Sequence, residues 1–164
     1  MSSARIPYVY RMHHTEEGLE QMGQPMRSVV DNGRIKRWLD AQGYRVEYYA
    51  QSWVGLWGNV LLDFSVRGEH DEYLVVRGTE RGSHPDGQHD LLEDCCNAWN
   101  RDYEGPAAYL QSSEGGLVFC TLLVVNCQGG MDDGQFDRLM KYAMAGSDGF
   151  LGFAQGQLSR IRVA

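Results

Sequence analysis

The chain has 164 residues, 43% of them hydrophobic and 23% charged, which is the composition of one ordinary globular domain. The formal net charge of -7 argues against nucleic acid and an anionic membrane surface as partners, because both are bound by clustered Lys and Arg. No apolar run reaches the ~20 residues that span a bilayer, and the N-terminus lacks the apolar core of a signal peptide. We therefore expect a cytoplasmic protein.

The beginning of the chain shows no clear periodicity. Residues 1–27 are treated as an N-terminal extension whose order the sequence leaves open, and the folded domain is expected at residues 28–164. The extension holds the pair His13 and His14, but no third ligand follows at helix or strand spacing, so a solvated pair is expected rather than a metal site.

The first helix is predicted at about Val29 to Gln42. Its apolar residues Ile35, Trp38 and Leu39 recur at three- and four-residue steps, as one face of a helix requires. Ser28 or Asp31 is suited to cap its start, and the glycine after Gln42 is suited to the left-handed residue that ends a helix.

Three strands are predicted next, at Arg45 to Ala50, Asn59 to Arg67 and Tyr73 to Thr79. Apolar and polar residues alternate along them, which is typical of an antiparallel sheet covered on one face. The stretch Ser52 to Gly58 is interpreted as a glycine-rich turn, and Glu80 to Gln88 as a polar loop.

A second helix is predicted from Leu91 to Tyr103, again from its apolar spacing, with Asp86 or Asp90 as its cap. Gly105-Pro106 ends it, because proline lacks the amide that a helix needs. Pro106 to Ser112 and Leu117 to Cys127 are then predicted to be two strands, joined by a tight hairpin at the glycines that separate them.

A last helix begins after Met131, where Asp132 or Asp133 can cap it. Gly146, Gly149 and Gly152 interrupt its apolar stripe, so the continuity of this helix is left open. The predicted order is α-β-β-β-α-β-β-α, an α+β domain whose antiparallel β-sheet is backed by helices.

The predicted second helix ends in Asn-Ala-Trp-Asn (Asn97, Trp99, Asn100), and a loop leads from there to Pro106 and the hairpin. In this order the chain resembles the YbjN family, often labelled sensory transduction regulators, over roughly Val29 to Leu158. The layout is also similar to that of bacterial type III secretion chaperones. The glycines of the last helix depart from the alanine-rich helix that is usual in the family.

The resemblance implies a small homodimer that presents its sheet and helices to another protein or polypeptide segment, and it carries over no catalytic residue and no cofactor. We therefore expect a non-enzymatic protein-binding or regulatory module, without nucleic-acid or membrane partners. Large aromatic side chains at or beside the predicted turn are the candidate protein-interaction residues, namely Trp53, Trp57 and Tyr49. The competing interpretation is a hairpin folded onto its own sheet.

The alternative function is a small metal-dependent hydrolase that uses the His84-Asp90 loop. His84, Asp86, His89 and Asp90 are ligand types for zinc, but a proline and a glycine interrupt the segment. A solvated loop with a capping aspartate is the competing interpretation. Asn97 and Asn100 are expected to satisfy helix carbonyls while Trp99 packs in the core.

Four cysteines are present, at Cys95, Cys96, Cys120 and Cys127, without a Cys-x-x-Cys spacing. Two of them are adjacent on a predicted helix, which is poor geometry for a disulfide with each other. We expect four buried, reduced thiols.

Overall fold

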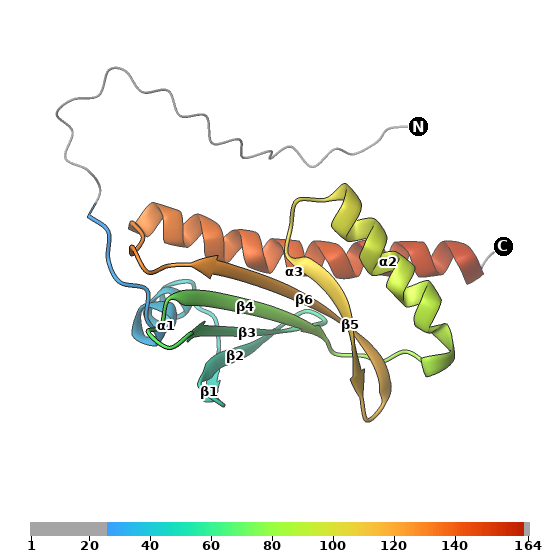
Figure 1. Cartoon of the computed structure of the whole chain (residues 1–164). Coiled ribbons are helices and arrows are strands. Elements are labelled where there is room, and N and C mark those ends of the chain that lie inside the picture. The colour runs from blue at the N-terminus through green and yellow to red at the C-terminus, as the bar shows by residue number, and fades with distance from the viewer. Residues whose placement is uncertain (1–25, 163–164) are drawn as a thin grey trace, which may run out of the picture.

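The computed structural model describes residues 26–162 (Figure 1). The predictions for residues 1–25, including the His13 and His14 pair, lie outside these residues. In chain order the elements are α1 (Asn32–Ala41), β1 (Glu47–Tyr49), β2 (Ser52–Trp57), β3 (Val60–Arg67), β4 (Tyr73–Glu80), the 3-10 turn η1 (Asp86–Gln88), α2 (His89–Asp102), β5 (Ala107–Ser113), β6 (Gly116–Asn126) and α3 (Asp133–Arg162).

The six strands form one antiparallel sheet in the order β1-β2-β3-β4-β6-β5. Helices α1 and α3 lie on the same face of this sheet, and α2 lies beside β5 (Figure 1). The predicted α+β class with an antiparallel sheet backed by helices is confirmed.

The predicted glycine-rich turn at Ser52 to Gly58 is wrong, because residues 52–57 form β2 and raise the number of strands before α2 to four. The strand contains Gly55 because no side chain fits at this position. A Cβ would come within 2.8 Å of the carbonyl oxygen of Arg45. Only Gly58, with φ of +57°, belongs to the turn that follows.

The core lies between α1, α3 and the covered face of the sheet. Phe119 of β6 meets Phe150 of α3 with ring centroids 5.3 Å apart and nearly perpendicular planes. Ile35 and Leu39 of α1 are fully buried in the same hydrophobic cluster, as the helical spacing predicts.

Helix α3 is continuous over 30 residues, so its glycines do not interrupt it. Gly146 lies against Pro106, and a Cβ at this position would overlap the Cδ of that proline. A Cβ at Gly149 would lie 3.6 Å from the Trp99 indole, which is an ordinary van der Waals contact. Gly146 therefore allows the segment between α2 and β5 to approach the helix closely, and this packing offsets its low helix propensity.

Side chains fix the starts of two helices. The carboxylate of Asp31 accepts a hydrogen bond from the Arg34 amide at 2.6 Å and caps α1. Asp132 and Gln135 form a reciprocal capping box before α3. Helix α2 has no side-chain cap, so the capping role predicted for Asp86 or Asp90 is wrong.

Candidate interaction surface

Within residues 26–162, helices α1, α2 and α3 leave one face of the sheet uncovered, and this side is called the outer face below. Side chains alternate between the two faces along each strand, and residues paired across neighbouring strands lie on the same face. The burial of one set of alternate residues shows which side chains point into the core, so the other set lies on the outer face. The apolar residues of the outer face include Tyr49, Val54, Leu56, Leu61, Tyr73, Val75, Leu122 and Val124. Its polar residues include Glu47, Ser52, Asp63, Ser65, Arg67, Arg77, Thr79 and Asn126.

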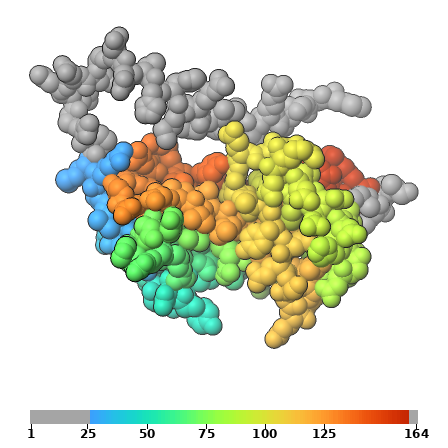
Figure 2. All heavy atoms as spheres, viewed as in Figure 1, coloured from blue at the N-terminus to red at the C-terminus, as the bar shows by residue number. Residues whose placement is uncertain are grey.

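The outer face is apolar and hollowed. Tyr49 is 76% exposed, Val124 50%, Leu56 48% and Leu61 42%. Figure 2 shows a hollow on this side, between the protruding β1–β2 end and the protruding tip of the β5–β6 hairpin. Large exposed apolar side chains on one face are typical of interaction sites.

Two arginines on the outer face are already engaged within the protein. Arg77 forms an ion pair with Asp63 at 3.3 Å in the middle of the face. Arg67 donates hydrogen bonds to the Ala50 carbonyl, the Gln51 side chain and the Ser52 hydroxyl. Arg67 and Arg77 therefore help to hold these strands in place.

The turn between β1 and β2 has an unusual backbone. Ala50 and Gln51 both have positive φ, 48° and 66°, as in a type I′ hairpin turn, where asparagine and glycine are preferred. Its bonds to Arg67 hold this turn on β3. The strained turn presents Tyr49 at the edge of the outer face.

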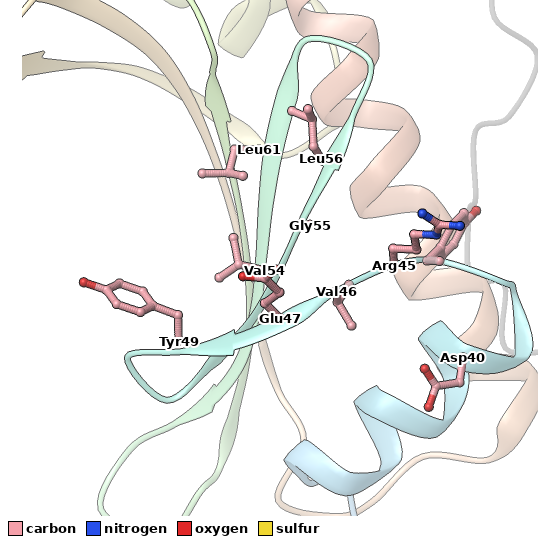
Figure 3. A pocket seen from close by; sticks show the side chains of 10 residues that line it. Asp40, Arg45, Val46, Glu47, Tyr49, Val54, Gly55, Leu56 and Leu61 are labelled. Atoms are coloured by element: carbon pink, nitrogen blue, oxygen red, sulfur yellow. The ribbon is translucent and has the colours of Figure 1, made fainter.

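A groove with a volume of about 710 Å³ lies beside Tyr49. Figure 3 shows that its lining comes from the end of α1, from the segment that leads into β1, and from the β2–β3 hairpin. Val54, Leu56 and Leu61 supply its apolar side. Asp40 and Glu47 supply carboxylates, and Arg45 supplies a guanidinium group. The groove therefore extends the outer face around the β1 edge.

The three predicted interaction residues lie on opposite faces of the sheet. Tyr49 is on the outer face, whereas Trp53 and Trp57 are half-buried on the covered face. The Trp53 indole donates to the Asn32 carbonyl at 2.8 Å, and the Trp57 ring packs edge-on against Tyr44 and Phe64. Their role in an interface stays a prediction, although the turn on which it depended is a strand.

The Asn-Ala-Trp-Asn motif joins α2 to the edge strand β5. The Asn100 side chain donates to the Ala108 carbonyl and accepts from the Ala108 amide, both at 2.8 Å. The Trp99 indole is buried and donates to the Pro106 carbonyl at 3.0 Å. Trp99 is thus in the core as predicted, but the expectation that Asn100 satisfies helix carbonyls is wrong, because its amide pairs with a strand.

The sequence matches the family described as "YbjN: Putative bacterial sensory transduction regulator" over residues 31–154. The chain belongs to the YbjN family. The structure is similar to one described as "Crystal structure of YbjN, a putative transcription regulator from E. coli", with a TM-score of 0.59 and 17% identity, over 79% of this chain and 91% of that one. At this identity the likeness concerns the fold. No curated protein matches the chain.

Within residues 26–162, no helix of this YbjN-family chain is both long and apolar enough to cross a membrane.

The His84-Asp90 loop does not assemble a ligand set. His84 pairs its Nε2 with the buried Glu80 carboxylate at 2.8 Å, whereas His89 is exposed and lies near Asp90 and Glu93. The described part of the chain contains no group of three or more His, Cys, Asp or Glu side chains that could hold a metal ion. The structure thus gives the metal-dependent alternative no support.

The four cysteines of this family member are free and buried, as predicted. Burial raises the pKa of each thiol, and that of Cys96 reaches about 12, with further contributions from its neighbours Cys95 and Cys120. The protonated thiol is a poor nucleophile, so these side chains behave as small apolar core residues.

Sequence reasoning missed the outer face as a site because it concentrated on aromatic residues near a presumed turn. A signal was available in the run Leu117 to Val125, which is apolar at every position except Thr121. A strand of that composition has two apolar faces, and in a sheet with helices on one side only, one of them remains uncovered.

Proposed function

We propose that this YbjN-family chain is a non-enzymatic, chaperone-like regulatory module of the cytoplasm, which binds another protein through the outer face of its sheet. The observation that carries the proposal is an apolar, hollowed sheet face that the protein's own helices leave uncovered. The family description as a regulator is in keeping with this role.

The rigidity of the surface also supports binding. The Asp63–Arg77 ion pair and the hydrogen bonds of Arg67 connect neighbouring strands on the outer face. A preorganised face loses less conformational entropy when it binds than a mobile one.

The test is site-specific photo-crosslinking in the bacterium that encodes the protein. A benzophenone amino acid replaces Leu61 or Val124 on the outer face, and Val29 serves as the control because it is apolar and 74% exposed elsewhere. We expect a light-dependent adduct with a different protein at the first two positions only. Equal adducts at all three positions, or none on the outer face, would refute the proposal.

The homodimer expected from the sequence is a second part of the proposal. Light scattering at micromolar concentration is expected to give twice the 18.5 kDa mass of the chain, because twofold dimers are the commonest oligomers. A mass of one chain would exclude the dimer without affecting the proposed outer-face site.

A further inference from the structure

The shape of the outer face restricts what can occupy it. Its hollow lies between two protruding elements, the β1–β2 end and the β5–β6 hairpin (Figure 2). A twofold dimer would bring the same patch of both copies together, and two hollow surfaces do not fill each other. The occupant must therefore be convex.

The length of the face matches that of one helix. Six strands at about 4.8 Å spacing extend about 24 Å across the sheet, and eight residues of β3 or β4 extend about 26 Å along it. That area of about 600 Å² approaches the ~800 Å² that each partner buries in a standard interface. A helix of about 16 residues is about 24 Å long and about 10 Å wide.

Strand addition is the main competing mode, and both sheet edges restrict it. At the β5 edge, Asn100 already occupies the backbone donor and acceptor of Ala108. At the other edge, β1 has only three residues, and few outward backbone groups remain for an added strand. The wide outer face offers more contact area than either edge.

The charge of the outer face indicates what kind of helix it binds. Arg67 and Arg77 are engaged internally, as described above, and the exposed Arg45 lines the groove at the β1 edge. Four exposed acidic residues at the ends and turns of the strands outnumber Arg45. These are Glu47 at the β1 edge, Glu69 and Asp71 in the β3–β4 turn, and Glu114 at the β5–β6 tip. Within residues 26–162 none of these four carboxylates forms an ion pair. Together with the net charge of -7, they favour a cationic partner.

We infer that the outer face binds a cationic amphipathic α-helix of the partner protein, with the apolar stripe of the helix in the hollow and its Lys or Arg residues at the acidic rim. This inference rests on the proposed function and specifies its partner.

Titration with synthetic peptides tests it. The probe is a labelled Leu/Lys peptide of about 18 residues with all leucines on one helical face. Two matched peptides serve as controls, one with the same composition scrambled and one with Glu in place of Lys. Fluorescence anisotropy is expected to show that the protein binds the probe with a Kd below about 100 µM. Both controls are expected to bind at least about tenfold more weakly.

Variants of the protein locate the site. The double change Leu61→Gln and Val124→Gln is expected to raise the Kd of the probe about tenfold or more, whereas Val29→Gln leaves it unchanged within about twofold. Circular dichroism checks the fold, and Tyr49→Ala, at a largely exposed position, provides a second test if the double variant is unstable. Glu47→Gln with Glu114→Gln is expected to weaken binding and flatten its salt dependence.

Several outcomes overturn the inference. They are no binding of the probe, equal binding of the scrambled peptide, or an unchanged Kd in well-folded outer-face variants. Crosslinking at Leu61 and Val124 without peptide binding would leave the protein-binding function in place and reject the helix. Peptide binding without any crosslinked protein would reject the proposed function instead.

Discussion

The Asn100 side chain offers the sharpest test of the fold, because one amide satisfies two backbone groups of a different element. In Asn100→Ala, the N–H and C=O of Ala108 lose hydrogen bonds of 2.8 Å each. Each bond contributes about 0.5–1.5 kcal/mol net, and a buried group left without a partner costs about 1–3 kcal/mol. Ala108 is only 5% exposed, but Asn100 itself is exposed. Water can therefore form hydrogen bonds with the freed backbone groups and offset part of the lost stability. We expect the free energy of unfolding to fall by about 2 kcal/mol.

Urea denaturation followed by circular dichroism measures this loss, and Asn97→Ala is the matched control. Asn97 lies on the same helix, is exposed, and has no side-chain hydrogen bond within residues 26–162. Both variants gain the same helix propensity, so their difference isolates the strand contacts. Asn100→Asp retains the acceptor and loses the donor, and is expected to lie between them. If Asn100→Ala and Asn97→Ala differ by less than about 0.5 kcal/mol, the argument for the strand contact fails.

Three further predictions concern stability, each measured by urea unfolding. Gly146→Ala is expected to destabilise the protein because a Cβ there overlaps the connection between α2 and β5. Gly152→Ala is expected to stabilise it by up to about 1 kcal/mol, because a Cβ at Gly152 has nothing within 4 Å. A change of the same sign in the free energy of unfolding of both variants would contradict this packing. Ala50→Asn is expected to stabilise by about 0.5–1 kcal/mol because asparagine tolerates positive φ, and a loss would show that the turn is not strained. The thiol pKa values are raised on folding, and that of Cys96 reaches about 12, so above about pH 8.5 the unfolded chain releases protons that the folded chain keeps. Stability therefore falls as pH rises from about 8.5, less so in Cys96→Ala, and a pH-independent stability would exclude this linkage.

Regular alternation and helical spacing made most of the fold predictable from the sequence. The β3–β4 and β5–β6 pairs and all three helices lie where apolar residues repeat at the expected period. The missed strand β2 shows the limit of that approach. Gly55 looks like a turn residue in the sequence, and only the approach of the Arg45 carbonyl explains why a strand requires glycine there.

The candidate surface was less predictable because it depends on which face of the sheet the helices cover. Val54 lies in the segment predicted as a turn and Leu61 in a predicted strand, and the β2–β3 register assigns both to the outer face. The role of Asn100 also requires the structure, since its partner Ala108 follows after a loop whose path the sequence does not specify.

The buried Arg34 has a consequence for the order of folding. Its guanidinium contacts the Ser28 and Met131 carbonyls and the Asp133 carboxylate, which joins segments about 100 positions apart in the chain. Strands β1 to β4 pair only with sequence neighbours among themselves, so their loops close at lower entropic cost. We therefore expect the β1–β4 meander to form early and α1 to dock last. In native-state hydrogen exchange, the amides of α1 should accordingly open at lower free energy than those of β3 and β4.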